Sequence, residues 1–168
     1  MPEGEYVTAW SQFHLLPGAI DAIAKLKRAG LLVIVVTNQR GIALGLYRAK
    51  DIVRIHARLQ QELAVNGARI DGFYICPHDN GVCQCRKPQT GLFAQAMADF
   101  PGIRPESSVM VGDSFSDIEF PRNAGMKSIF IKGEPGEDKD RKLSGLKAAQ
   151  LADLCVATFL DAVNAVVG

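Results

Sequence analysis

Residues 76–88 read CPHDNGVCQCRKP, and this stretch decides how the rest of the chain is interpreted. It holds three of the four cysteines and one of the three histidines, and the positive charges of Arg86 and Lys87 follow directly. Three thiolates and one imidazole form the donor set of a closed structural zinc site. The ligands would be Cys76, His78, Cys83 and Cys85. Because a cation pair suits an oxyanion such as phosphate, the stretch predicts a zinc-held loop beside an anion site, and therefore an enzyme.

Other interpretations of the same stretch remain open at this point. The spacing of the cysteines differs from that of the usual zinc fingers, and the residues could be incidental. A Cys76–Cys83 disulfide is possible, although it leaves Cys85 and His78 without a role. Exposed Arg-Lys pairs are common and usually have no function. Cys155 lies in an apolar run and is expected to belong to the core.

The length and composition are those of one ordinary globular domain. The chain has 168 residues, 48% hydrophobic and 22% charged, with a formal net charge of +1. This charge gives no reason to expect nucleic acid or an acidic membrane as a partner. The longest apolar run, 31–36, is too short to span a bilayer, and the polar N-terminus does not resemble a secretory signal. We therefore expect a cytoplasmic monomer with reduced cysteines.

Short apolar runs alternate with amphipathic stretches along the chain, which is typical of an α/β fold with a parallel sheet. The fold class predicted is a three-layer, Rossmann-like parallel sheet. Pro121 is expected to kink or shorten its helix, and 132–141 is expected to be a loop. Helices are predicted at 17–30, 48–65, 91–100, 116–123 and the C-terminus, and strands at 31–36, 72–75, 108–111, 128–131 and 154–157.

Three polar groups punctuate this pattern. Thr37, Asn38 and Gln39 follow one strand, Arg86 and Lys87 follow the cysteine loop, and Asp113 follows Gly112 at the end of another strand. Ligands of open parallel sheets bind at the carboxyl ends of the strands, so we expect these groups to converge on one rim.

Each group has an ordinary alternative. Thr37 and Asn38 with free backbone N–H groups could hold phosphoryl oxygens, but Thr-Asn is also common turn chemistry. Asp113 could hold Mg²⁺ beside a phosphate or cap a helix, with Ser114 and Ser116 as rival caps. Asp117 could orient Lys87 or a metal-bound water, or be an exposed first-turn acid.

Together these residues resemble the haloacid dehalogenase (HAD) superfamily of phosphatases. Within it, they are most similar to the subgroup of the D-glycero-D-manno-heptose 1,7-bisphosphate 7-phosphatases and the histidinol-phosphate phosphatases. The similarity runs from about residue 6 to the C-terminus. The matching segments are 16–19 (LPGA), 36–43 (VTNQRGIA), 76–78 with 83–88, 111–114 (VGDS) and 123–125 (NAG).

The resemblance implies a single HAD-like domain over 1–168 without a large cap domain. It implies a Mg²⁺-dependent phosphomonoesterase that acts on a small phosphorylated metabolite, a sugar like heptose 1,7-bisphosphate, through an aspartyl-phosphate. The zinc loop, 76–88, would be a structural flap. Thr37 would stabilise the phosphoryl group and Lys87 neutralise it; Asn38, Gln39, Arg40 and Arg86 would bind substrate, and Asp113 would bind Mg²⁺.

Two departures concern charge. The family often has arginine where Leu44 stands and lysine or arginine where Ser114 stands. Both changes remove positive charge near the expected pocket, which makes a heptose bisphosphate less certain and leaves histidinol phosphate as a rival substrate.

A third departure is an absence. The family's nucleophile lies in an Asp-x-Asp-Gly motif at the end of its first strand, and the motif would fall before Met1. Asp138-Lys139-Asp140 has the spacing but lacks a preceding strand and a following glycine, so we expect a solvated loop there. We therefore expect an N-terminally truncated chain that is inactive by itself and lacks a central strand, which leaves facing edges unpaired. A non-catalytic phosphosugar-binding or scaffold protein is the alternative.

Overall fold

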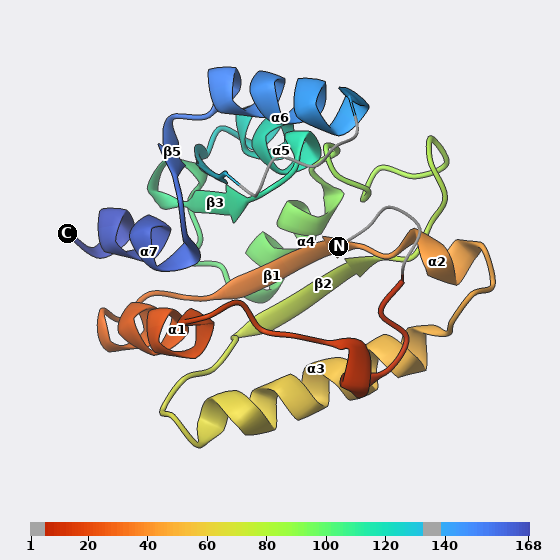
Figure 1. Cartoon of the computed structure of the whole chain (residues 1–168), viewed down its shortest axis with the longest axis horizontal. Coiled ribbons are helices and arrows are strands. Elements are labelled where there is room, and N and C mark those ends of the chain that lie inside the picture. The colour runs from red at the N-terminus through yellow and green to blue at the C-terminus, as the bar shows by residue number, and fades with distance from the viewer. Residues whose placement is uncertain (1–5, 133–138) are drawn as a thin grey trace. The chain divides into compact units, whose positions relative to one another are not determined.

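The computed structural model describes residues 6–132 and 139–168, and the side chains of 6–132 and 142–168. The chain divides into two compact units, Met1–Cys83 and Gln84–Gly168. Each unit contains a parallel sheet of its own, with two strands in the first and three in the second (Figure 1). This confirms the predicted α/β class with parallel strands, which form two sheets within the described residues.

The first unit is built on two parallel strands. Thr37 lies opposite Ile75 and Asn38 opposite Cys76, so both strands end at the same level. The side chains of Ile52, Ile55 and Tyr47 form a buried cluster against which Ile75 packs. In chain order the elements are η1 (Trp10–Gln12), α1 (Ala19–Arg28), β1 (Ile34–Asn38), α2 (Arg40–Ala43), α3 (Ala49–Ala64) and β2 (Gly72–Cys76).

The predicted helices of this unit are confirmed, but the first strand begins later than expected. α3 buries Ile52, Ile55, Leu59 and Leu63, which recur at spacings of three and four. β1 starts at Ile34 rather than Leu31. The reason is that Gly30 adopts a positive φ of 76° and Leu31 N–H bonds back to the Leu26 carbonyl. This closing turn of α1 includes Leu31, the residue at which the sequence predicts the strand to begin.

β1 is also less buried than its apolar sequence suggested. All five of its residues are half-buried rather than buried. Within the described part of the chain β1 pairs with β2 alone.

A buried carboxylate fixes the amino ends of β1 and β2. Asp71 accepts hydrogen bonds from Lys27 Nζ at 2.6 Å and from Val33 N–H at 2.8 Å, and Arg69 lies within 2.9 Å. Burial raises the pKa of Asp71, but these hydrogen bonds outweigh it, so the pKa lies below its usual value. Asp71, which directly precedes β2, thereby ties the backbone just before β1 to α1.

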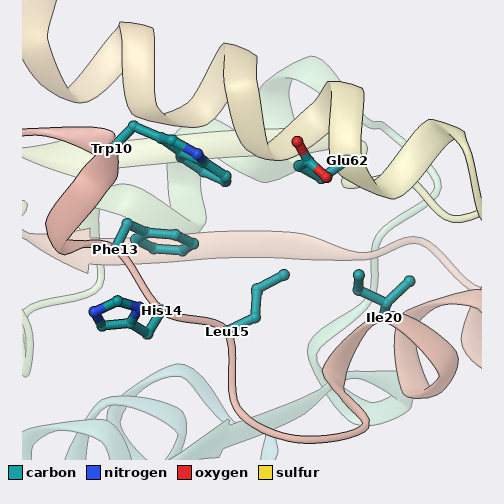
Figure 2. Close-up of a pocket in the computed structure, with 6 residues that line it drawn as sticks. All are labelled: Trp10, Phe13, His14, Leu15, Ile20 and Glu62. Carbon is teal, nitrogen blue, oxygen red and sulfur yellow. The ribbon is translucent and has the colours of Figure 1, made fainter.

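A pocket of about 340 Å³ lies in the first unit, away from the residues predicted to carry chemistry. The rings of Trp10 and Phe13 stack there, with their centroids 5.3 Å apart. Figure 2 shows the lining: Trp10, Phe13, His14, Leu15, Ile20 and Glu62. None of the predicted site residues belongs to it.

The second unit is a three-stranded parallel sheet in the order β3-β4-β5. α5 packs on β3 and β4, α6 packs on α5, and α7 contacts all three strands. Ile118, Phe130 and Ala148 form its buried cluster, and Cys155 packs against this cluster as predicted. The elements are α4 (Gly91–Asp99), η2 (Pro105–Ser107), β3 (Val109–Gly112), α5 (Phe115–Ala124), β4 (Lys127–Ile131), α6 (Lys139–Leu151), β5 (Leu154–Val156) and α7 (Phe159–Val167).

The structure contradicts two expectations for the second unit in part. α5 is not shortened by Pro121 but continues to Ala124 and ends at Gly125, whose φ is 74°. The proline removes one intrahelical donor, and its ring is fully buried, so packing offsets the loss. The predicted loop 132–141 is helical from Lys139 onward, which includes Asp140. Residues 133–138 of that loop, with Asp138, lie outside the described residues.

Among the described residues, no helix combines the length and the apolar character that crossing a membrane requires.

Candidate functional site

The carboxyl end of β1 carries a chain of three side chains joined by hydrogen bonds. Gln39 Nε2 donates to Thr37 Oγ1 at 3.0 Å, and the Tyr47 hydroxyl donates to Gln39 Oε1 at 2.5 Å. Gln39 N–H donates to the Cys76 carbonyl at 2.8 Å, which holds its backbone to the end of β2. Two predicted site residues, Thr37 and Gln39, are thus brought together. Tyr47 is a polar partner that the sequence did not reveal.

Tyr47 is enclosed on the side of Gly41. The tyrosine is 7% exposed, and its ring lies 5.8 Å from that of Tyr6. A Cβ at Gly41 would sit 2.1 Å from Tyr47 Cε1, so no side chain fits there while the ring keeps its place. Burial, followed by the nearby Tyr6, raises the pKa of Tyr47, which keeps the phenol protonated at neutral pH.

Arg40 links the first turn of α2 to the cysteine loop. Its Nε pairs with Asp79 Oδ1 at 2.5 Å, and both side chains are about two-fifths exposed, at 40% and 41%. The hydrogen bond that Arg40 donates to Asp79, together with the negative charge of Asp79, raises the pKa of Arg40. Because Asp79 lies between His78 and Cys83, this pair connects a predicted substrate-binding residue to the predicted zinc loop.

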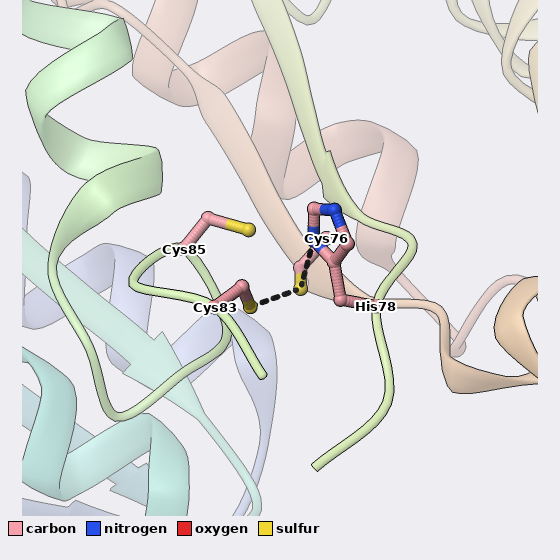
Figure 3. Close-up of side chains that lie close together, drawn as sticks. All are labelled: Cys76, His78, Cys83 and Cys85. Atoms are coloured by element: carbon pink, nitrogen blue, oxygen red, sulfur yellow. Dashed lines mark hydrogen bonds between the residues drawn. The ribbon is translucent and has the colours of Figure 1, made fainter. Parts of the chain in front are cut away.

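The predicted zinc ligands form a cluster. One ligand atom from each of Cys76, His78, Cys83 and Cys85 lies within 4.8 Å of the others, and Figure 3 shows the four side chains together. Cys76 Sγ is 3.7 Å from His78 Nδ1 and 3.5 Å from Cys83 Sγ. No disulfide joins Cys76 and Cys83 at this separation, which contradicts the alternative of a disulfide.

These separations fit a tetrahedral zinc ion. Zn–S bonds of about 2.3 Å place two sulfur ligands about 3.8 Å apart, and a sulfur and a nitrogen about 3.6 Å apart. The distances from Cys76 Sγ to Cys83 Sγ, 3.5 Å, and to His78 Nδ1, 3.7 Å, lie close to these values. The donor set and its geometry therefore suit a closed site of the structural kind.

In the second unit, Lys87 and Asp117 form a buried ion pair. Lys87 Nζ donates to Asp117 Oδ1 at 2.6 Å, and each side chain is 10% exposed. Asp117 Oδ2 accepts from the hydroxyl of Ser114 at 2.7 Å, so each carboxylate oxygen has its own donor. Of the two alternatives for Asp117, the orienting partner of Lys87 is confirmed and the exposed acid is wrong. Ser114, rather than Asp113, caps α5.

Gly112, the last residue of β3, allows this ion pair to form. A Cβ on Gly112 would lie 2.2 Å from Asp117 Cβ and 2.7 Å from Asp117 Oδ2. Such contacts do not occur between real atoms, so any side chain at 112 would displace the carboxylate from Lys87. The close approach of strand and helix explains why glycine precedes Asp113 here.

In the same unit, one nitrogen of Arg86 and the carboxylate of Asp113 have no partner among the described residues. Arg86 Nη1 is a buried atom without a hydrogen-bond partner in the described part of the chain. Asp113 is exposed, directly after β3. It makes no hydrogen bond or ion pair with any described residue. A buried guanidinium donor without an acceptor favours binding of an anion, and an uncommitted carboxylate can bind a cation.

Comparison with known proteins identifies the family. A family model described as HAD-hydrolase-like matches residues 84–162. The D-glycero-beta-D-manno-heptose-1,7-bisphosphate 7-phosphatase of Pasteurella multocida is 34% identical over 158 residues, 89% of this chain and 85% of the relative. The chain belongs to the heptose-bisphosphate phosphatase family of HAD-like hydrolases.

A second relative of this family shows higher identity over a shorter stretch. The D-glycero-alpha-D-manno-heptose-1,7-bisphosphate 7-phosphatase of Mycobacterium tuberculosis (strain H37Rv) is 46% identical over 121 residues, 71% of this chain. The match spans 64% of that relative's length.

Solved structures agree with the family assignment. The D,D-heptose 1,7-bisphosphate phosphatase from B. bronchiseptica, complexed with magnesium and phosphate, superposes with a TM-score of 0.82. The two are 26% identical, over 95% of this chain and 87% of that chain. The corresponding phosphatase from Burkholderia thailandensis has a TM-score of 0.63 at 24% identity, over 93% and 88% of the two chains, which supports the fold alone.

The close approach at Gly112 predicts a sharp mutational effect in this HAD-like unit. We expect Gly112→Ala to lower the free energy of unfolding by about 2–3 kcal/mol, because the added methyl must push Asp117 away from Lys87 and Ser114. Urea denaturation followed by circular dichroism measures the change.

Gly102→Ala is the matched control, since a Cβ at Gly102 would meet no atom within 4 Å. We expect its unfolding free energy to stay within about 0.5 kcal/mol of the wild type, as for other surface substitutions. Equal effects of the two substitutions would contradict the tight contact.

Proposed function

We propose that the chain carries the phosphate-binding part of a Mg²⁺-dependent phosphomonoesterase that acts on a phosphorylated sugar, heptose 1,7-bisphosphate. Family membership gives the reaction class, and one observation within the chain supports it most: the unpaired, buried Nη1 of Arg86 directly beside Lys87 in sequence. A buried charged donor that lacks an acceptor costs about 1–3 kcal/mol or more. A phosphate oxygen would supply the acceptor and a counter-charge.

Lys87 and Arg86 would divide the work on the phosphate. The ion pair with Asp117 fixes the position of the Lys87 ammonium before a ligand binds, so binding does not have to order this side chain. Arg86 presents a planar fork that matches two phosphate oxygens at once. The negative charge of Asp117 offsets the positive charge of Lys87, so the pair attracts anions less strongly than an unpaired lysine would.

Asp113 would hold the Mg²⁺ ion. Mg²⁺ binds through one or two carboxylates and keeps several waters, so a single exposed carboxylate after a strand is a sufficient protein ligand. Within the described residues, the Cys/His set is the one group of three or more potential metal ligands, so Asp113 belongs to no such group there. The bound ion would supply charge neutralisation of the phosphoryl oxygens.

In the first unit, we propose that the Thr37 hydroxyl donates to a phosphoryl oxygen. Asn38, Gln39 and Arg40 would line the substrate pocket, as the family resemblance implies. The hydrogen bonds of Gln39 to Thr37 and Tyr47 support a positioning role for that side chain in addition.

The chemical step of this family requires an aspartate that attacks phosphorus. The 168 residues contain no Asp-x-Asp-Gly motif. We therefore propose that residues 1–168 by themselves bind the phosphosugar without hydrolysing it. Placing the family's Asp-x-Asp-Gly segment in front of Met1 should supply the nucleophile.

Binding and phosphate release, measured together, test this proposal. We expect calorimetry in the presence of Mg²⁺ to show binding of heptose 1,7-bisphosphate to residues 1–168, with phosphate release at background. Both anomers are compared, since one relative is named for the alpha form and another for the beta form. Histidinol phosphate is the competing ligand.

A chimera with an Asp-x-Asp-Gly segment before Met1 should release phosphate, and its Asn-x-Asp-Gly counterpart should not. If residues 1–168 do not bind the heptose bisphosphate, the proposed function is wrong. If the chimera binds but stays inactive, the non-catalytic binding protein is the better account. Preference for histidinol phosphate would change the substrate and keep the reaction class.

We also propose that Cys76, His78, Cys83 and Cys85 bind a structural zinc ion. The four ligand atoms lie within 4.8 Å of one another, and three thiolates with one imidazole are a donor set of structural zinc sites, which supports this proposal. The ion would hold the loop 76–88 in shape, and with it the backbone before Arg86.

Metal analysis tests the zinc proposal independently of activity. The purified chain should contain about one zinc per chain, and chelation should lower its melting temperature. Cys85→Ser should lose most of the zinc, whereas Cys155→Ser, the matched control, should keep it because Cys155 packs in the core. Equal zinc in both variants, or none in the wild type, would contradict the site.

The proposed partner is thus a small phosphorylated metabolite rather than nucleic acid or a membrane. A monomer located in the cytoplasm completes the proposal.

A further inference from the structure

The Tyr47–Gln39–Thr37 hydrogen-bond chain leads to a function for Tyr47. We infer that Tyr47 is a positioning residue that sets, through Gln39, the direction in which the Thr37 hydroxyl donates its hydrogen. The inference rests on the proposed role of Thr37 as a phosphate donor. It concerns three residues of the first unit, and Tyr47 itself is not expected to touch the substrate.

The order of donors and acceptors follows from the chemistry of the three groups. A neutral phenol has one O–H to donate, and an amide has a donor end and an acceptor end that differ. The Tyr47 hydroxyl donates to Gln39 Oε1, which leaves Gln39 Nε2 facing Thr37. Since an amide NH₂ only donates, Thr37 Oγ1 must accept, and its own hydrogen remains for another acceptor.

This direction is the one that phosphate requires. The oxygens of a phosphate dianion accept hydrogen bonds and do not donate them, so the hydroxyl must present its hydrogen outward. With the amide of Gln39 turned by 180°, Oε1 would face Thr37 and take up that hydrogen. The hydroxyl would then offer lone pairs to the phosphate, which repel it.

Tyr47 disfavours the turned amide. The hydroxyl of this nearly buried tyrosine has Gln39 Oε1 as its hydrogen-bond acceptor, and no other described residue accepts from it. Turning the amide would leave the phenol hydrogen unsatisfied in a buried place, which is unfavourable.

The ring is held firmly enough to exert this preference. Tyr47 packs in a cluster with Ile52 and Ile55, and Gly41 leaves the space that the ring fills. The backbone of Gln39 is fixed to Cys76. The fold therefore fixes both the tyrosine ring and the backbone of Gln39, and the side-chain amide between them is the part that can turn.

Phosphate binding by single and double variants tests the inference. Inorganic phosphate is titrated calorimetrically in the presence of Mg²⁺ into the chain. We expect Tyr47→Phe, which keeps the ring and removes the hydroxyl, to weaken binding roughly tenfold, the scale of one hydrogen bond to a charged group. The melting temperature verifies that the variant is folded.

Tyr6→Phe is the matched control. Tyr6 packs against the same ring, and no described residue hydrogen-bonds its hydroxyl, so its removal should leave the dissociation constant within about twofold. The double variant separates positioning from packing. With Thr37→Val the hydroxyl is already lost, so adding Tyr47→Phe should change binding by less than about twofold.

The outcomes are distinct. Phosphate binding that is unaffected by Tyr47→Phe overturns the inference and leaves the proposed function standing. An undiminished effect of Tyr47→Phe in the Thr37→Val background also overturns it, because the tyrosine would then act through packing. If the wild-type chain binds no phosphate, the proposed role of Thr37 fails and the inference with it.

Discussion

The ion pair between Lys87 and Asp117 is the constraint on which the candidate site of the second unit depends. A carboxylate and an ammonium that are both nine-tenths buried lose most of their contact with water, and the ion pair offsets this loss. The geometry of the pair requires glycine at 112, where strand and helix approach too closely for a side chain. It also places the cap of α5 on Ser114. A strand end, a helix start and a cation are thereby fixed by one carboxylate.

In the first unit, neutral groups rather than charges hold the candidate binding group in place. At the end of β1, an amide takes a hydrogen bond from a buried phenol and gives one to a threonine hydroxyl. In both units the group that we propose to bind a ligand is therefore oriented by a neighbouring side chain, which is itself held by packing. Such preorganisation lowers the cost of ordering a binding group when the ligand arrives.

The sequence predicts those parts of the molecule that depend on local pattern. The stripe of α3, the four-ligand loop and the position of Asp113 after a strand all lie within short segments, and all are found where expected. Residue partnerships that depend on tertiary packing are not visible in the sequence. Tyr47 looks like an ordinary core aromatic until its hydroxyl is placed against Gln39.

Helix α6 was missed for a different reason. Leu143, Leu146 and Leu151 are all exposed, and the segment contains Gly145, so it has no apolar stripe of the kind that marks a buried helix. The unpaired Nη1 of Arg86 likewise has no sequence signal, because exposed Arg-Lys pairs look identical in sequence. The burial of Arg86 Nη1 distinguishes this arginine from one whose guanidinium is fully solvated.

We propose that a phosphate oxygen accepts a hydrogen bond from Arg86 Nη1, the buried guanidinium nitrogen that lacks an acceptor among the described residues. A titration of ¹⁵N-labelled protein with inorganic phosphate, followed through the arginine guanidinium resonances, tests it most directly. The account predicts that the Arg86 signal shifts and saturates with phosphate, and that Arg86→Lys binds more weakly. An Arg86 signal that stays in place while phosphate binds would contradict it.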